Sequence, residues 1–252
     1  MPFPDELARG LAVVAYDHRW PGDFAVLARA IHGALGPEAV RVNHVGSTSV
    51  PGLAAKDCID VQVEVRDLAE ELIAVRFGAI GFRQRPEPWN HVEATPRGPC
   101  PKLVFAPAEG ERASNIHVLQ AASEAARHKL LFRDFLRGHD MARDAWSDFK
   151  QRLAAMTTDI YQYGQAKAGP TQILMIAAES WARQTRWAPP WSSRSSHAYL
   201  QLTRSRWSER RRIGRLTLGF QAGSYRLHTA GGQRRHGLRA GHSVPARLGL
   251  VR

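Results

Sequence analysis

Isoleucine and valine alternate with polar residues from position 59 to position 65, the clearest pattern in the chain. This period of two predicts a β-strand with one buried face and with Asp60, Gln62 and Glu64 together on the other. A second β-branched run, residues 40–45, predicts a strand that enters a small-residue turn. The turn consists of Gly46, Ser47, Thr48 and Ser49.

The remaining periodicity predicts an α/β (α+β) chain, with a mixed sheet flanked by helices and a helical C-terminal half. Helices are expected over residues 21–35, 67–77, 123–138, 141–156 and 161–181. Further strands are expected at residues 11–16, 102–106 and 115–119. Asp67 is predicted to cap the second helix, and Gly169-Pro170 to break or kink the last. The proline-rich stretch 85–101 is predicted to be a long loop over a site.

The positive charge of the chain is confined to its C-terminal part. Residues 187–252 hold 13 arginines, no lysine and one acidic residue, Glu209, which accounts for the whole net charge of +12. The preceding residues are electrically balanced, with 22 basic and 22 acidic side chains. The later segment also lacks periodic apolar runs. We therefore predict a folded domain at residues 1–186 and a disordered, arginine-rich extension at 187–252.

The extension offers a route to nucleic acid. Arginines 210–212 can pair with phosphates, and Trp207 can stack on a base. The alternative is a solvated extension that has no partner. Nucleic-acid binding is therefore expected only through the extension, because the charge-balanced domain has no basic excess.

Cysteine usage and the N-terminus favour a cytoplasmic protein. Cys58 and Cys100 have neither metal-ligand nor redox spacing, and Cys58 adjoins a strand that reads as buried, which indicates an inert thiol. The first residues lack a basic segment followed by an apolar one, so they do not form a signal peptide. No run of 18 apolar residues predicts a membrane span. The sequence gives no indication of oligomeric state.

The turn at residues 46–49 has the composition of a phosphate site. Gly46 has no Cβ, so backbone N–H groups can approach a phosphate, and the hydroxyls of Ser47, Thr48 and Ser49 can donate to it. Lys56 can neutralise the phosphate, and Asp60 can hold a hard cation such as Mg²⁺. The alternative is a tight turn with local hydroxyl bonds, a surface lysine and an Asp60 that pairs locally.

The run from His44 to Lys56, HVGSTSVPGLAAK, followed by Ile59-Asp60-Val61, resembles the GrpB (UPF0157) family. Further matching segments occur in the same order along the chain. They are Tyr16-Asp17 with Trp20-Pro21, Asn115-Ile116-His117-Val118, residues 131–137 (LFRDFLR), and Tyr161 with Lys167. The resemblance covers residues 10–183.

That family is similar to the nucleotidyltransferase superfamily, and its domain also occurs fused to dephospho-CoA kinase. The resemblance implies a nucleotidyltransferase-like mixed sheet and a nucleotide or phosphate site at the turn. In active nucleotidyltransferases an acidic pair on one strand face and a third acid hold two metal ions. Here Gln62 stands where the second acid of the pair is expected, and His117 is the candidate on the third strand. His117 shares its face with the polar Asn115.

Two functions follow from these residues. The first is a nucleotidyltransferase that acts on an unknown acceptor, with Asp60 and His117 as catalytic residues and Asp60 as the metal ligand. The second is a non-catalytic module that binds a nucleotide, a CoA metabolite or another phosphorylated small molecule. His44 reads as a ligand, an acid/base group or a structural histidine. Arg133 and Arg137 read either as anion-binding residues or as members of a surface charge network.

Overall fold

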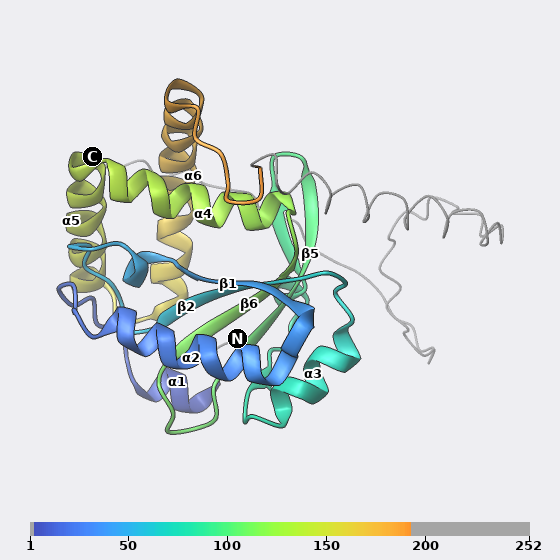
Figure 1. Cartoon of the computed structure of the whole chain (residues 1–252). Helices are drawn as coiled ribbons and strands as arrows, with labels where there is room; N and C mark the ends of the chain where they lie inside the picture. Colours follow the sequence, from blue (N-terminus) through green and yellow to red (C-terminus); the bar gives the residue numbers. More distant parts are fainter. Residues whose placement is uncertain (1–2, 193–252) are drawn as a thin grey trace, which may run out of the picture. The chain divides into compact units, whose positions relative to one another are not determined.

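A six-stranded mixed sheet forms the centre of the computed structural model, which describes residues 3–192 (Figure 1). The strands are β1 (Ala39–Val45), β2 (Ile59–Val65), β3 (Arg83–Gln84), β4 (Val92–Thr95), β5 (Gly98–Ala106) and β6 (Ser114–Gln120). Their order is β1-β2-β6-β5-β3, and β4 pairs with β5. Strands β2 and β6 run parallel, whereas the other pairs are antiparallel.

Helices cover both faces of the sheet. They are α1 (Pro4–Ala8), α2 (Trp20–Leu35), α3 (Glu70–Gly78), α4 (Glu124–Gly138), α5 (Asp140–Met156) and α6 (Ile160–Thr185). Helices α2 and α3 lie against one face and α4 against the other, as Figure 1 shows. Helices α5 and α6 pack on α4 through a second apolar cluster that includes Leu131, Trp146 and Ala178. The expected mixed α/β class with a helical C-terminal half is confirmed.

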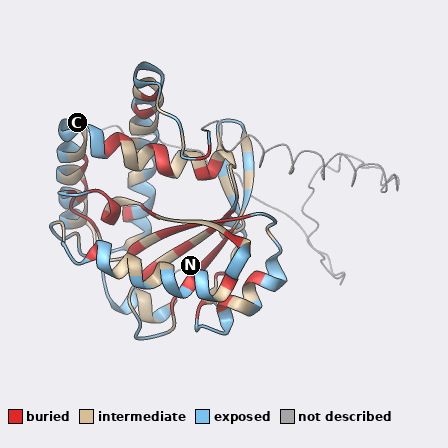
Figure 2. Cartoon of the chain, viewed as in Figure 1, coloured by how far each residue is buried: buried red, intermediate tan, exposed pale blue. Residues whose placement is uncertain are grey.

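The alternation in β2 places the core. Its four isoleucine and valine side chains are fully buried against α2 and α3. The other face is also covered, and the strands of the sheet are largely buried (Figure 2). Gln62 and Glu64 of β2 are fully buried. Glu64 accepts hydrogen bonds from Arg41, Asn43 and Gln62, which provide its carboxylate with the partners that a buried charge requires.

Two expectations near the N-terminal half are wrong. Residues 11–16 form no strand; only Val14 makes an isolated bridge, to Ala55. The residues around Val14 favour an extended backbone, but no neighbouring strand pairs with them, so this preference does not produce a strand. Asp67 does not cap α3, which begins at Glu70 after Ala69. The Asp67 carbonyl instead accepts the Ala69 N–H at 2.9 Å, so a turn precedes the helix.

Two further expectations concern proline. The stretch 85–101 is not a plain loop, because β4 and the start of β5 form a hairpin there. Helix α6 runs unbroken through Pro170 over 26 residues. Proline removes one backbone donor, and the adjacent Thr171 hydroxyl donates to the Lys167 carbonyl at 2.7 Å. Beyond the proline, Leu174 and Ala178 of α6 belong to the apolar cluster with α4 and α5, which stabilises the helix after this position.

The packed domain continues past residue 186. Trp191 is 7% exposed and lies against Val45 and Leu119, and the Trp187 indole donates to Asp134 at 3.1 Å. The rest of the predicted extension, including Trp207 and arginines 210–212, lies outside the described residues. Within residues 3–192, no helix has both the length and the apolar character needed to cross a membrane.

Candidate functional site

The Gly46 turn lies directly on Asp60. Strands β1 and β2 pair with Val45 opposite Asp60, so the residue after β1 meets that carboxylate. Gly46 has a φ of +68°, and a Cβ at this position would lie 2.2 Å from Asp60 Oδ2. Only glycine fits, because a side chain would collide with Asp60 and the backbone is left-handed. The turn and the acid predicted from the sequence therefore form one site.

Most of the hydroxyls in this turn hold its shape. Residues 47–49 form a 3-10 turn, in which the Ser49 hydroxyl donates to the Gly46 carbonyl at 2.6 Å. Thr48 is buried, and its hydroxyl pairs with His44 Nε2 at 3.0 Å. Thr48 and Ser49 thus have structural partners. The Ser49 N–H donates the first backbone hydrogen bond of the turn. The N–H groups of Ser47 and Thr48 come before this donor in the chain.

His44 is a structural histidine in this arrangement. Its ring stacks on Phe24 with centroids 4.8 Å apart, and it is 9% exposed. Burial, together with the charges of Arg137 and Arg133, lowers the pKa of His44 to about 4, against the opposing attraction of Asp60. The imidazole is therefore neutral at pH 7.

Two arginines of α4 donate hydrogen bonds to backbone carbonyls in and just before the turn. Arg133 donates to the His44 carbonyl at 3.1 Å, and Arg137 donates to the Ser49 carbonyl at 2.6 and 3.0 Å. Arg133 also pairs with Asp134 at 2.7 Å. The guanidinium groups therefore satisfy the carbonyls of the segment around the turn. Both arginines position the turn and belong to a charge network, which is the second of the two interpretations given for them from the sequence.

A buried lysine, absent from the sequence prediction, contacts the turn. Lys150 of α5 is 2% exposed, and its Nζ donates to Ser47 Oγ at 2.9 Å and to the Ala54 carbonyl. Burial, together with the charge of Lys167, lowers the pKa of Lys150 to about 7, against the opposing attraction of Asp60. The only sequence signal was its position four residues after Trp146, on the apolar face of the helix.

Lys167 of α6 is a second lysine with a lowered pKa. Burial, together with the charge of Lys56, lowers its pKa to about 8, against the opposing attraction of Asp60. Its Nζ lies 4.7 Å from the centre of the Tyr163 ring. Among residues 3–192, no ion pair includes Lys56, Lys150 or Lys167. Three of the five lysines in the chain thus gather near one carboxylate.

Asp60 faces two polar residues of β6. Asn115 donates to Asp60 Oδ1 at 3.3 Å, and His117 Nε2 lies 3.9 Å from the same oxygen. Burial alone would raise the pKa of Asp60, but His117, Asn115 and Lys56 together hold it below its usual value. The Asp60 side chain keeps 31% of its surface exposed. It is therefore an accessible carboxylate at neutral pH.

His117 is flanked by a second acid that the sequence prediction missed. Glu93 of the β4–β5 hairpin accepts from Lys102 at 2.9 Å and from Lys129 at 3.3 Å. Burial and the charge of Lys129 lower the pKa of His117, whereas Asp60 and Glu93 raise it. The net effect is a lowered pKa, which keeps His117 neutral at pH 7 and therefore able to accept a proton.

The side chains around Asp60 do not fit a two-metal centre. Gln62 brings no charge, and Glu64 is fully occupied by its own partners. Mg²⁺ prefers a shell of oxygen ligands with negative charge. A single Mg²⁺ on Asp60 would find only one carboxylate there, and three lysines lie close enough to act on that carboxylate electrostatically. The Mg²⁺ expected from the sequence stays a prediction.

A cavity of about 810 Å³ opens beside these residues. Asn115 and His117, both neighbours of Asp60, line it, and so do Lys56, Trp89 and Tyr161. Its volume lies within the range of small-molecule sites in proteins. From the stretch 85–101, Arg85, Trp89 and Asn90 line this cavity, and all three precede the β4–β5 hairpin.

The comparison with known families decides the assignment. A family model described as "GrpB protein" matches residues 10–175.

The chain belongs to the GrpB family.

A UPF0157 protein of Halalkalibacterium halodurans is 33% identical over 175 residues, which cover 68% of this chain and 83% of the relative. A dephospho-CoA kinase of Mycolicibacterium paratuberculosis is 29% identical over 204 residues, which cover 73% of this chain and 50% of that protein. The crystal structure of the conserved protein GrpB from Enterococcus faecalis has a TM-score of 0.58 and 25% identity. It covers 68% of this chain and 99% of that one.

The structure of this GrpB-family chain brings most of the predicted site residues together. Gly46, Ser47 and Asp60 are adjacent, and Lys56 and His117 border the cavity. Lys150 and Glu93 were missed, because each reaches the site from an element far away in sequence. Lys167 entered only through the family resemblance.

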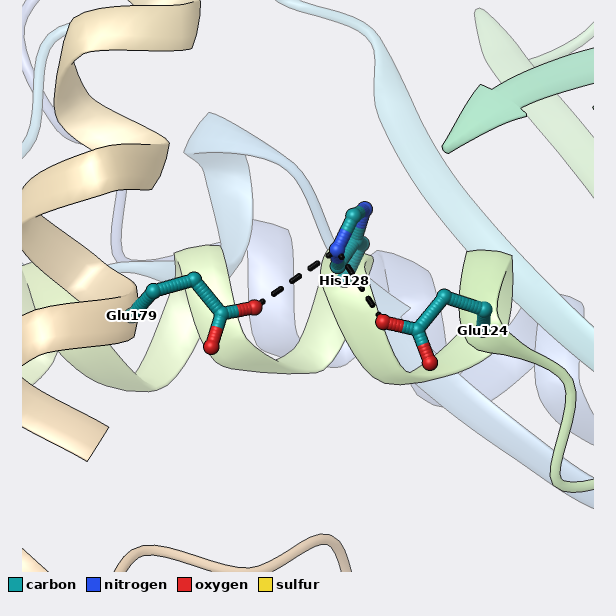
Figure 3. Close-up of side chains that lie close together, drawn as sticks. All are labelled: Glu124, His128 and Glu179. Carbon is teal, nitrogen blue, oxygen red and sulfur yellow. Dashed lines mark ion pairs between the residues drawn. The ribbon is translucent and has the colours of Figure 1, made fainter. Parts of the chain in front are cut away.

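A separate titratable cluster joins α4 and α6 (Figure 3). His128 Nε2 lies 3.4 Å from Glu124 and 3.6 Å from Glu179, a spacing that a metal ion can bridge. Arg127, however, donates to both carboxylate oxygens of Glu179, at 2.5 and 2.9 Å. Arg97 lies 3.4 Å from Glu124. These guanidinium groups already neutralise the acids, so the cluster is an ion network between helices of the GrpB-family domain.

Proposed function

We propose that this GrpB-family protein binds the phosphates of a nucleotide or of another phosphorylated small molecule at the Gly46 turn. The observation that carries the proposal is the contact between Lys150 and Ser47. A buried ammonium group without a carboxylate partner is costly, by several kcal/mol in typical proteins. A ligand phosphate at the turn would supply the missing negative charge. Lysine is also a common phosphate-binding residue.

Backbone N–H groups and lysine charge both favour an anion at this position. The N–H groups of Ser47 and Thr48 lie at the start of a short turn, where backbone donors favour an anion. Lys150 of α5 contacts Ser47 directly, and Lys167 of α6 acts electrostatically on Lys150, as Lys56 does on Lys167. In this proposal, lysine charge performs the neutralisation that a metal pair performs in two-metal enzymes.

The reaction class that the site favours is nucleotidyl transfer to an acceptor in the cavity. His117 would accept the proton of the acceptor hydroxyl, whose oxygen would attack the α-phosphorus. The bond from that phosphorus to the β-phosphate oxygen would break, and pyrophosphate would leave. Asp60, 3.9 Å from His117, would stabilise the imidazolium that forms. The lysines at the turn would hold the developing charge on the phosphates.

A non-catalytic role in CoA or nucleotide metabolism is the second candidate. The loss of the second carboxylate at Gln62 and the likeness to a protein named dephospho-CoA kinase favour it. The two roles share the same phosphate site and differ only in turnover. A cytoplasmic location and nucleic-acid binding by the extension remain predictions alongside both.

Thermal-shift measurements test the shared step. The protein is titrated with ATP, GTP, CTP, pyrophosphate and phosphorylated CoA precursors, each in parallel with the Lys150→Met variant. A ligand that binds the native state raises its melting temperature, and the proposal expects at least one of them to do so in the wild type alone. Equal shifts in wild type and Lys150→Met would contradict the assignment of the site. Labelled nucleotide with His117→Gln then separates transfer from binding.

A further inference from the structure

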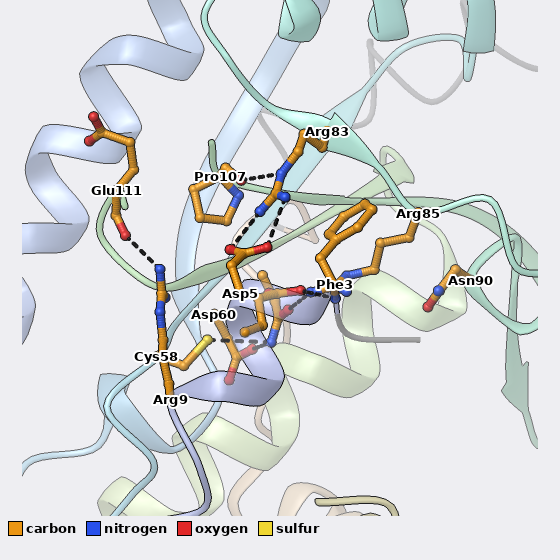
Figure 4. Close-up of polar contacts among 12 residues, drawn as sticks. Phe3, Asp5, Arg9, Cys58, Asp60, Arg83, Arg85, Asn90, Pro107 and Glu111 are labelled. Atoms are coloured by element: carbon orange, nitrogen blue, oxygen red, sulfur yellow. Dashed lines mark hydrogen bonds and ion pairs between the residues drawn. The ribbon is translucent and has the colours of Figure 1, made fainter. Parts of the chain in front are cut away.

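Ionic contacts fasten helix α1 beside the cavity (Figure 4). Asp5 pairs with Arg83 through two hydrogen bonds of 2.9 Å, and Glu6 pairs with Arg85 at 2.6 Å. The Phe3 ring lies 4.2 Å from the Arg83 guanidinium carbon. Helix α1 has five residues and buries none of them. A helix this short is not stable alone, so these contacts determine its position.

The pair formed by Glu6 and Arg85 belongs to the wall of the cavity. Both residues line it, together with Arg9 and Lys56. The two side chains are only 14% and 7% exposed, so salt screens their attraction less than that of a surface pair. Glu6 therefore places a carboxylate directly on Arg85, in a cavity wall that also contains Arg9, Lys56 and Arg112 as cations and Asp57 and Glu111 as acids.

Arg85 is connected to Asp60 through one intervening side chain. Its Nη2 donates both to Glu6 Oε1 and to Asn115 Oδ1, the latter at 3.1 Å. Asn115 donates in turn to Asp60 Oδ1 at 3.3 Å. An anion on Arg85 would therefore lie on the cavity side of Asp60, whereas Ser47 and Lys150 lie at the turn.

We infer that Arg85 is a second phosphate subsite, and that Glu6 occupies it in the ligand-free protein as an internal substitute for that phosphate. Arginine binds phosphate and carboxylate through the same donors, so one anion can replace the other. Because none of the side chains of α1 is buried, its release would take no side chain of its own out of the core. The contact between Arg85 and Asn115 would remain during the exchange.

The role of this subsite rests on the proposed function and deepens it. If the turn holds the phosphates of the nucleotide, Arg85 holds a phosphate carried by the second substrate. The acceptor would then be a phosphorylated molecule. Its binding would displace Glu6 and open the cavity, so α1 would limit access until that substrate arrives.

Binding of inorganic phosphate tests the subsite, measured by calorimetry on the full chain. The background is Lys150→Met/Lys167→Met, which removes the first site, and Glu6→Gln is added to it. We expect Glu6→Gln to strengthen phosphate binding at least tenfold, because Arg85 loses its internal anion. Glu71→Gln, an exposed acid on α3, is the matched control and should change nothing.

Adding Arg85→Gln to the Glu6→Gln protein decides between the subsite and an unspecific charge effect. The inference expects the gain in phosphate affinity to disappear. It is overturned if Glu6→Gln gives no gain, or if the gain survives the loss of Arg85. A purely structural ion pair would lower the melting temperature in Glu6→Gln and leave phosphate affinity unchanged. Because the background lacks Lys150 and Lys167, the result does not depend on ATP binding at the first site.

Discussion

Lys150 Nζ lies 2.9 Å from Ser47 Oγ, although 103 positions separate the two residues in the chain. The contact joins helix α5 to the turn after β1. It gives the Gly-Ser turn a cation that no local motif contains. Burying that cation has an energetic cost, which a bound anionic ligand would offset.

Replacing Lys150 by methionine should stabilise the ligand-free protein at low pH. The pKa of Lys150 is about 7 in the folded protein, below its ordinary value of 10.5. Below pH 7 both folded and unfolded states carry the proton, and the folded state bears the full cost of the buried charge. That cost declines as the pH rises through 7 toward 10.5.

The stabilisation by Lys150→Met should therefore be greater at pH 6 than at pH 9, by about 2–3 kcal/mol in the free energy of unfolding. Urea denaturation at the two pH values measures it. Arg152→Met, an exposed position on the same helix, is the control and should show no such dependence. A pH-independent effect of Lys150→Met would mean that the lysine is not desolvated.

Ligand binding at pH 8 should take up protons. At that pH Lys150 is mostly neutral and Lys167, with a pKa of about 8, is half neutral. A bound polyphosphate favours the charged form of both, so roughly one proton should be taken up per ligand. Calorimetry with tripolyphosphate in buffers of different ionisation enthalpy measures the number. No uptake at pH 8 would show that the two lysines do not face the ligand.

Gly46→Ala should destabilise the fold and displace Asp60. The added Cβ would lie 2.2 Å from Asp60 Oδ2, at a φ of +68°. We expect a loss of at least about 2 kcal/mol in the free energy of unfolding, from the left-handed backbone and the collision. Gly33→Ala on α2 is the matched control, since its Cβ meets no atom within 4 Å. That change should stabilise the helix by roughly 0.5–1 kcal/mol.

Asp60→Asn separates a lysine site from a metal-dependent one. If lysine charge alone binds the phosphates, removing a nearby negative charge should strengthen tripolyphosphate binding several-fold. If Asp60 holds a Mg²⁺ that bridges to the phosphates, the same change should weaken it. Calorimetry with and without Mg²⁺ compares the two, and Asp67→Asn, an exposed acid before α3, is the control.

The sequence allowed prediction of the parts of the site that depend on local pattern. The alternation in β2 fixed which side of the strand Asp60 faces, and the glycine before Ser47 marked the close approach to that acid. Register then brought them together, since Val45 pairs with Asp60. The strands β1, β2, β5 and β6 were predicted for the same reason: apolar patterning records burial.

The parts that depend on distant contacts could not be predicted. Lys150 lies on an apolar helix face, and nothing in its neighbourhood reveals that Ser47 is its partner. Glu93 lay in a stretch that proline made look like a loop. The continuity of α6 through Pro170 likewise depends on packing against α4 and α5, which overrides the local preference.

The most direct test of the phosphate site is a calorimetric titration of the full chain with tripolyphosphate in the presence of EDTA. Wild type is compared with Lys150→Met/Lys167→Met. A lysine-based site predicts metal-free binding by the wild type and at least a hundredfold weaker binding by the double variant. Equal binding by the two proteins, or no binding by the wild type until Mg²⁺ is added, would contradict it.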